Sequence, residues 1–445
     1  GRYFFAVACI CLLIGVLMTL HKPKSTTFYL KEGCLATSLS WILLSLFGAI
    51  PFWISGEIPH WEDALFETIS GFTTTGATVL GNVEALSHTA LIWRSFTHWI
   101  GGMGVLVFLL AILPLSGGSS INLMRAESPG PSVGKLVPKV RYTAMILYTI
   151  YFGMTVIEFI FLLAGHMPLF DALTTAFGTA GTGGFGIKND SIMGYSPYIQ
   201  WVVAIFMILF GINFNLYFLL LMKNVKGFFK NEELRNYLGI VAAAIVLITI
   251  NIMNLYGGVL HAFRYAAFQV VSVITTTGFV TANFDLWPEF SKTILLVLMF
   301  VGACAGSTGG GMKVSRIMIL GRTITKETRQ ILHPKSVNVV KLDGKRLTNE
   351  ETHGVYVYTI CYFVILCVSV LLVSVDNFDF TTNFTAVLTT LNNVGPGLAK
   401  VGPVENFSAF SCFSKIILSL DMLIGRLEIL PIMMLLAPVT WRKKF

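Results

Sequence analysis

The main pattern along the chain is a series of long apolar runs separated by short polar connections. Nine runs are long enough to cross a lipid bilayer, which takes about 20 residues as a helix. The first stands alone and the other eight form four pairs, so the pattern predicts an all-α integral membrane protein. The nine runs lie near residues 3–20, 34–54, 89–114, 142–165, 197–222, 237–260, 292–320, 353–375 and 410–439.

A shorter segment rich in Thr and Gly lies inside each pair of runs. Each segment begins with an amphipathic stretch of about ten residues, which as a helix reaches only about 15 Å, half of a bilayer. We therefore expect a half-helix that enters the membrane and returns as a loop, a structure tolerated only inside protein or beside a watery cavity. The four segments are Trp61–Leu80, Leu169–Lys188, His261–Asn283 and Phe380–Lys400.

This order predicts four helix–pore-loop–helix repeats around a central pore, plus at least one extra N-terminal helix. A period near 100 residues is too long for a solenoid, but transporters are often built from such repeats. Because an apolar run follows Gly1 directly, we expect the chain to lack some N-terminal sequence, up to a whole helix. The expected divisions are 1–24 for the extra helix and 25–118, 119–230, 231–335 and 336–445 for the repeats.

Composition and charge agree with a bilayer environment. The chain is 55% hydrophobic and 12% charged, whereas a soluble domain carries about 25% charged residues. The net charge of +8 comes from basic connections that alternate with acidic ones, and the positive-inside rule places the basic set in the cytoplasm. Setting topology is a sufficient role for most of these lysines, and nothing here predicts a nucleic-acid partner. The basic stretches are 22–31, 125–141, 223–235, 322–346 and 442–444.

Other classes of chemistry lack their sequence signals. The seven cysteines show no metal-ligand spacing with histidine and no disulfide framework. The chain has no HExxH, no GxSxG and no paired intramembrane carboxylates with a base, and Asp421 and Glu428 are the only acidic candidates in the last run. We therefore expect neither an enzyme nor a cofactor beyond the transported ion.

The loops after the half-helices carry the candidate chemistry. Glycine adopts the unusual backbone angles needed to aim successive carbonyl groups to one side, and threonine adds a neutral acceptor. The C-terminal end of each half-helix also favours a cation. One such loop alone is equally consistent with a Gly-rich turn, but four copies favour a filter. The loop segments are Thr74-Thr75-Gly76-Ala77, Thr182-Gly183-Gly184-Phe185, Thr276-Thr277-Gly278-Phe279 and Asn393-Val394-Gly395-Pro396.

Two of these loops resemble degenerate copies of the potassium-channel filter Thr-Val-Gly-Tyr-Gly. They are Thr182–Gly186 and Asn393–Gly397. That filter replaces the hydration shell of an ion with rings of backbone carbonyls. By this resemblance, K⁺ would bind at Thr75, Gly76, Gly183, Gly184, Thr277, Gly278, Val394 and Gly395.

The whole pattern resembles the TrkH/TrkG/KtrB superfamily of bacterial potassium uptake proteins, most closely its TrkH/TrkG branch. The resemblance covers nearly the whole chain and includes the motifs Trp99–Gly104, Arg125–Pro131, Gly302–Gly311 and Gly425–Glu428. It implies a multi-pass protein of the bacterial cytoplasmic (inner) membrane that passes K⁺, and often Rb⁺, in preference to Na⁺. Members with serine at the first filter glycine tend to admit sodium, and all four positions here are glycine.

The resemblance also implies a gate beneath the filter. The gating loop would be Cys304, Ala305, Gly306, Ser307, Thr308, Gly309, Gly310 and Gly311. Its glycines each disfavour a helix by about 1 kcal/mol relative to alanine, although small residues also mark tight helix packing. Arg426 would face the pore as an electrostatic barrier, the alternative being an ion pair with Glu428 or Asp421. Arg94 and His98 would only anchor their helix or hydrogen-bond the half-helix.

Some functional questions stay open at this level. The four loops are unequal and Pro396 replaces the aromatic residue of the filter, so a sodium-permeable or weakly selective cation transporter is the alternative. Passive flux and coupling to H⁺ or Na⁺, as in a symporter, are not distinguished. The family implies a homodimer and a cytoplasmic TrkA/KtrA-type nucleotide-binding ring, for which 313–348 and 441–445 are candidate docking surfaces. The chain has no nucleotide-binding motif of its own.

Overall fold

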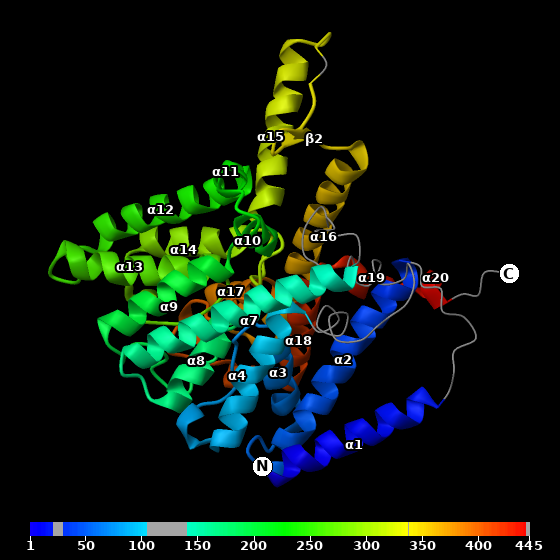
Figure 1. Ribbon diagram of the computed structural model, residues 1–445, viewed down its shortest axis with the longest axis vertical. Coiled ribbons are helices and arrows are strands. Elements are labelled where there is room, and N and C mark those ends of the chain that lie inside the picture. Colours follow the sequence, from blue (N-terminus) through cyan, green and yellow to red (C-terminus); the bar gives the residue numbers. More distant parts are fainter. Residues whose placement is uncertain (21–29, 105–139, 337, 442–445) are drawn as a thin grey trace.

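The computed structural model describes residues 1–20, 30–104, 140–336 and 338–441 (Figure 1). These parts are helical apart from loops, short 3₁₀ turns and one two-residue hairpin, β1 (Lys341–Leu342) with β2 (Lys345–Arg346). The first half contains α1 (Arg2–Thr19), α2 (Leu30–Ser55), α3 (Trp61–Phe72), α4 (His88–Met103), α7 (Val140–Ala164), α8 (Leu169–Ala180), α9 (Pro197–Phe210), α10 (Phe214–Leu221) and α11 (Val225–Lys230). The second half contains α12 (Glu232–Ile252), α13 (Val259–Ile274), α14 (Glu289–Val301), α15 (Val314–Leu332), α16 (Asn349–Val373), α17 (Phe380–Leu391), α18 (Cys412–Arg426), α19 (Leu430–Leu436) and α20 (Pro438–Trp441).

Four units of the same element order follow α1. Each unit has a long first helix, a short second one, a loop and a third helix. Three of the short helices have 12 residues and α13 has 16, so each reaches only about 18–24 Å. The units are α2–α3–α4, α7–α8–α9, α12–α13–α14 and α16–α17–α18.

The third helices begin alike because a polar side chain caps most of them. The hydroxyl groups of Ser87, Ser196 and Ser411 each accept a hydrogen bond from the N–H three residues later, which satisfies one of the free donors of a helix start. The third helix of unit 3 begins after Pro288 instead. Because the four helices start at equivalent positions, residues at the same distance from each N-cap can be compared between units.

Two of the runs that the sequence predicts as single spans are broken in the structure. Run 197–222 bends by 91° between α9 and α10, and run 410–439 stops at Arg426 and restarts at Leu430. Run 292–320 is interrupted between α14 and α15, as expected from its glycines. Among the described residues, five helices are long and apolar enough to span, or six if the bent pair counts as one span.

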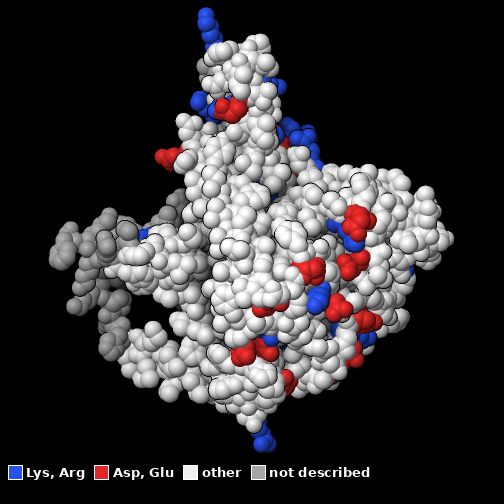
Figure 2. All heavy atoms as spheres, turned by 180° about the vertical axis from the view of Figure 1, so that it is seen from behind, with Lys and Arg blue, Asp and Glu red and all other residues white. Residues whose placement is uncertain are grey.

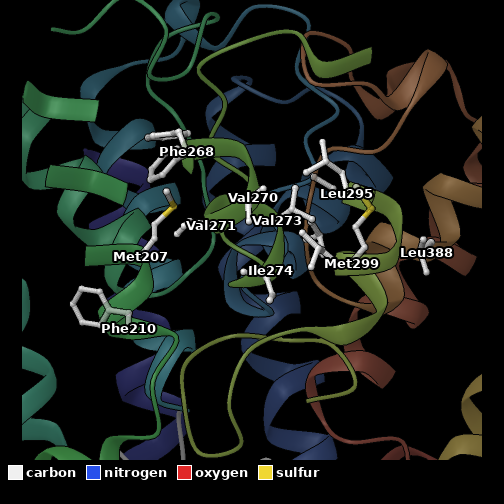
Figure 3. Packing of buried hydrophobic residues seen from close by; sticks show 14 of the residues in the cluster. Met207, Phe210, Phe268, Val270, Val271, Val273, Ile274, Leu295, Met299 and Leu388 are labelled. Atoms are coloured by element: carbon white, nitrogen blue, oxygen red, sulfur yellow. The ribbon is translucent and has the colours of Figure 1, made fainter. Parts of the chain in front are cut away.

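The units close into a ring because each third helix packs on the short helix of the next unit. The contacts join α4 to α8, α9 to α13, α14 to α17, and α18 back to α3. Figure 3 shows this packing for α9 and α13: Met207 lies beside Phe268 and Val271, and Phe210 lies further along α9. All four of these side chains are fully buried. The short helices therefore lie inside the ring, with their C-terminal ends held close together.

The outer surface is largely apolar. The first helices expose rows of Leu, Ile, Val and Phe, and α1 has one buried residue, Val7. α15 projects from the body (Figure 1), and basic side chains gather around that projecting end (Figure 2). A lipid bilayer is the environment in which so wide an apolar surface is stable.

Some predicted features lie outside the described residues. They are the motif Arg125–Pro131, the end of run 89–114, the divisions between 24 and 25 and between 118 and 119, most of the basic stretches 22–31 and 125–141, and the tail 442–445.

Candidate functional site

The four short helices end in the same backbone geometry. In each unit, the residue before the central glycine donates its N–H to a carbonyl oxygen five residues earlier, at 2.9 Å in every case. The four hydrogen bonds run from Thr75 to Ser70, Gly183 to Gly178, Thr277 to Ser272 and Val394 to Thr389. The loops therefore leave their helices along equivalent paths.

Each loop also turns through two left-handed residues. The central glycines have φ between 73° and 95°, and the residue two positions earlier has φ between 52° and 58°. Three of these earlier residues are threonines and one is Asn393, a type that tolerates this region better than most. Holding threonine there costs energy, so the fold specifies this conformation three times where glycine would adopt it freely.

The central glycines and the preceding carbonyl groups meet in a closed ring. Each glycine of one unit lies against a carbonyl oxygen of the next, so close that a side chain has no space. A Cβ built at Gly395 would lie 2.7 Å from the carbonyl oxygen of Thr75, and the other three would collide more severely. Around the ring the contacts are Gly76 on Gly183, Gly184 on Thr277, Gly278 on Val394, and Gly395 on Thr75.

The ring opens to one side into a polar cavity of about 150 Å³. Its lining includes all four central glycines together with Ala77, Phe185 and Pro396. The structure therefore brings together predicted site residues from all four units. Thr75, Thr182, Thr276, Thr277, Asn393 and Val394 are fully buried.

A buried ion pair between α3 and α4 stabilises the loops of units 1 and 2. The Nη2 atom of Arg94 on α4 lies 2.7 Å from the Oε1 atom of Glu67 on α3. The Glu67 carboxylate also accepts hydrogen bonds from the Thr78 hydroxyl group and the Val79 N–H. Arg94 donates to the carbonyl oxygen of Gly186 at 3.1 Å. The pair thus connects the loop of unit 1 to the loop of unit 2.

His98 connects the same two units one helical turn further along α4. Its Nδ1 lies 2.7 Å from the carbonyl oxygen of Gly71, at the end of α3. Its Nε2 accepts a hydrogen bond from the N–H of Phe185 at 3.2 Å. The expected hydrogen bond from His98 to the half-helix is therefore present, together with one to the neighbouring loop.

The residues of the predicted gating loop lie in the interruption between α14 and α15. The segment begins at Gly302 and ends at Lys313, slightly longer than the predicted Cys304–Gly311. It pairs with the break between α9 and α10, because Cys304 N–H donates to Gly211 and Phe214 N–H donates to Gly306. Six residues of the predicted gating loop are buried: Cys304, Ala305, Ser307, Thr308, Gly309 and Gly310.

This segment lies directly against the helix ends that form the ring. Gly310 donates its N–H to the Thr276 hydroxyl group at 2.6 Å. A Cβ at Gly309 would lie 2.9 Å from the carbonyl oxygen of Thr275, and one at Gly310 would strike that of Asn392. Small residues are thus required here for contact with units 3 and 4.

Arg426 secures the segment from α18. Its guanidinium group donates to the carbonyl oxygen of Thr308 at 2.8 Å and to that of Gly102 at 2.7 Å. Glu428 pairs with Arg316, and Asp421 accepts from Ser369.

Three residues of this region were not predicted as site residues. Lys313 donates to the carbonyl groups of Gly309 and Gly310. Glu233 on α12 accepts from the N–H groups of Ala305 and Ser315, at 2.8 and 3.0 Å. Glu233 and Arg316 lie at the start of apolar or amphipathic helices, where a charge usually marks only the membrane boundary. Their positions in the sequence give no signal that Glu233 and Arg316 contact the segment Gly302–Lys313 or its flanks.

Comparison with known proteins agrees with this architecture. The family model described as "Cation transport protein", TrkH, matches residues 2–443. The chain belongs to the TrkH family. The TrkH family member of Salmonella typhimurium, a Trk system potassium uptake protein, is 37% identical over all of this chain and 93% of its own length. TrkG of Escherichia coli is 32% identical over 95% of this chain and 87% of its own.

A solved TrkH structure has the same fold. The crystal structure of the potassium transporter TrkH from Vibrio parahaemolyticus superposes with a TM-score of 0.89 at 32% identity, covering 99% of this chain and 92% of that one. Membership in the TrkH family and the apolar helices together identify the chain as a multi-pass membrane protein, as the sequence predicted.

Proposed function

We propose that this chain is the pore-forming subunit of a Trk-type potassium uptake system of the bacterial inner membrane. The observation that carries the proposal is the closed ring in which four glycines meet four carbonyl oxygens, one pair at each boundary between units. Relatives named Trk system potassium uptake proteins support the choice of ion. No enzymatic activity and no cofactor beyond K⁺ are proposed.

Selectivity would arise from the backbone of the four loops. Carbonyl groups replace the hydration shell of a monovalent cation without introducing the full negative charges that favour divalent ions. The short helices aim their C-terminal ends at the loops, which adds partial negative charge near the ion. Thr75 and Thr277 contribute neutral hydroxyl groups, each 2.8 Å from another threonine hydroxyl group.

The segment Gly302–Lys313 would act as the gate. It lies against Thr275, Thr276 and Asn392 at the ends of two short helices, so an ion leaving the ring on that side meets it. Arg426 places a positive charge at the same level. Movement of this segment would be required for conduction.

The proposed assembly follows the family. We propose a homodimer with one pore in each chain and a cytoplasmic nucleotide-binding ring that controls the gate. The projecting α15 and the hairpin after it carry Arg322, Lys326, Arg329, Lys345 and Arg346, a basic surface suited to docking. α15 is continuous with the proposed gate at Val314.

A sodium-permeable or weakly selective transporter is the second candidate. The observation in its favour is the inequality of the four loops, since Ala77, Phe185, Phe279 and Pro396 follow the four glycines. Unequal walls give unequal carbonyl positions, which discriminate less sharply between two ions of the same charge.

Ion flux into liposomes tests both candidates. Purified protein is reconstituted and Rb⁺ uptake is measured with Na⁺ in competition, using wild type, Gly278→Ser and a control, Gly239→Ser, whose site on α12 is open. Potassium selectivity predicts Rb⁺ uptake well above Na⁺ uptake, lost in G278S and kept in G239S. Equal uptake of both ions by wild type supports the second candidate.

Repeating the assay with a nucleotide-binding ring subunit and ATP covers the case of a closed pore. No flux of either ion under both conditions would reject conduction itself.

A further inference from the structure

His98 differs from the residues at equivalent positions of the other units. It follows the N-cap of its helix, Ser87, by eleven residues, and the corresponding positions in α9, α14 and α18 are all methionines: Met207, Met299 and Met422. All four side chains are fully buried. Three boundaries in the ring thus place a thioether where the first boundary has an imidazole with two polar atoms.

The two hydrogen bonds of His98 determine its tautomer. The carbonyl oxygen of Gly71 can only accept, so Nδ1 carries the hydrogen. The N–H of Phe185 can only donate, so Nε2 is unprotonated. The neutral imidazole ring of His98 therefore forms a bridge from α3 of unit 1 to the loop of unit 2. It fits so tightly that a Cβ at Gly183 would collide with it.

This bridge determines the direction of a carbonyl group. The N–H of Phe185 and the C=O of Gly184 belong to one planar peptide group, which is trans, and therefore point in opposite directions. Because the N–H points to His98, behind the loop, the Gly184 carbonyl points away from His98. Gly184 is one of the four central glycines and lines the polar cavity.

A second contact favours the same arrangement. The guanidinium group of Arg94 lies over the Phe185 ring, with its central carbon 4.0 Å from the ring centroid. The His98 ring approaches the same phenyl ring, at 4.3 Å between centroids. Phe185 is thus held by its backbone and its side chain from one helix.

We propose that His98 is a positioning residue for ion selection, which holds the Gly184 carbonyl toward the permeating ion by accepting the Phe185 N–H. The proposal rests on the proposed function, since it presumes that the ring of central glycines and carbonyl oxygens is an ion filter. At the boundary between units 1 and 2, a hydrogen bond from the loop to His98 would hold the loop backbone in place. The methionines at the other three boundaries cannot provide such a bond, because a thioether is at most a weak acceptor. Loss of the bond frees the peptide between Gly184 and Phe185 to rotate, which removes one of the carbonyl groups that replace the hydration shell.

The test compares two substitutions at position 98. H98M introduces the residue that the other three units use, with similar volume and no hydrogen bond. H98Q keeps one donor and one acceptor. The control is Met207→Leu, a volume-conserving change at the equivalent position of unit 2. The ratio of Rb⁺ to Na⁺ flux is measured in liposomes, because a ratio is independent of the amount of active protein.

We expect H98M to lower this ratio about fivefold to tenfold, the effect of one lost buried hydrogen bond. H98Q should retain most of it, and M207L all of it.

A second variant removes the donor instead of the acceptor: Phe185→Pro lacks the N–H, as Pro396 does in unit 4. If the bond between the two residues carries the effect, H98M combined with F185P lowers the ratio no further than F185P alone.

Two outcomes would overturn the proposal. One is a selective wild type whose ratio is unchanged in H98M. The other is a loss of selectivity in H98Q as large as in H98M, which would assign His98 a packing role only. A wild type that passes Rb⁺ and Na⁺ equally, or neither, would instead reject the proposed potassium filter, so the two failures are distinguishable.

Discussion

The guanidinium group of Arg426 donates a hydrogen bond to the carbonyl oxygen of Thr308, at 2.8 Å. The same group donates to the carbonyl oxygens of Gly101 and Gly102 at the end of α4. One side chain of unit 4 therefore joins the interrupted helix of unit 3 to unit 1. Because the geometry of a planar guanidinium group suits several acceptors at once, Arg426 restrains the segment as well as placing a charge beside it.

Replacing Arg426 should open the proposed gate. We expect Arg426→Gln to raise Rb⁺ flux through the isolated protein about tenfold or more, because the segment loses charged hydrogen bonds. Arg426→Lys should have a smaller effect, since an ammonium group keeps the charge but not the fork. Liposome flux measures both, and equal flux in wild type and R426Q would contradict the restraint.

A methyl group at a central glycine should disrupt the ring. Gly184→Ala places a Cβ on the carbonyl oxygen of Thr277 and forces alanine to φ of 73°. We expect the unfolding free energy to fall by at least about 2 kcal/mol and ion flux to be lost. Thermal unfolding in detergent measures the first effect. Gly239→Ala, at an open helical position, is the control and should leave stability unchanged or slightly higher.

Removing Glu233 should loosen the interrupted helix. Its carboxylate accepts two N–H groups, one from Ala305 within the segment and one from Ser315 in the first turn of α15. We expect Glu233→Leu to raise the rate at which a thiol reagent modifies the buried Cys304 by about tenfold, the effect of one to two lost hydrogen bonds to a charged group.

The measurement requires a background without the other six cysteines. Glu233→Gln, which keeps an acceptor oxygen, should react at an intermediate rate. Equal Cys304 reactivity in all three proteins would show that Glu233 does not hold the segment.

The buried pair of Glu67 and Arg94 allows a double-mutant test. Removing either partner leaves the other charge buried and unpaired, which typically costs about 3–5 kcal/mol. We expect Glu67→Leu and Arg94→Met each to lower the thermal midpoint strongly. The double variant should recover part of this loss, because no isolated charge remains. Additive losses would contradict the coupling.

The sequence predicted a helical membrane protein correctly because the signals for that class are local. Apolar runs near 20 residues long and glycines such as Gly76 and Gly278 mark spans and loops without knowledge of neighbours. The breaks after Phe210 and Arg426 were missed because an apolar run looks alike whether it is straight or bent. The polar or helix-breaking residues near these breaks are Gly211, Asn213 and Asn215 at the first, and Gly425, Arg426, Glu428 and Pro431 at the second.

Pairing across units could not be predicted from one sequence. His98 and Phe185 lie 87 positions apart, and Glu233 and Ser315 lie 82 apart. Nothing in the local pattern distinguishes such a histidine from one that only ends a hydrogen-bond network. Its contrast with Met207, Met299 and Met422 became visible only when the helix starts aligned the four units.

The placement of four unequal loops in a single chain has a consequence for how such a ring changes in evolution. In a ring of identical subunits, every substitution alters all four walls at once. Here Phe185 can change while Phe279 and Pro396 stay as they are. In the proposed filter, ion preference would therefore change one wall at a time, and a variant with one altered wall would keep three unaltered ones.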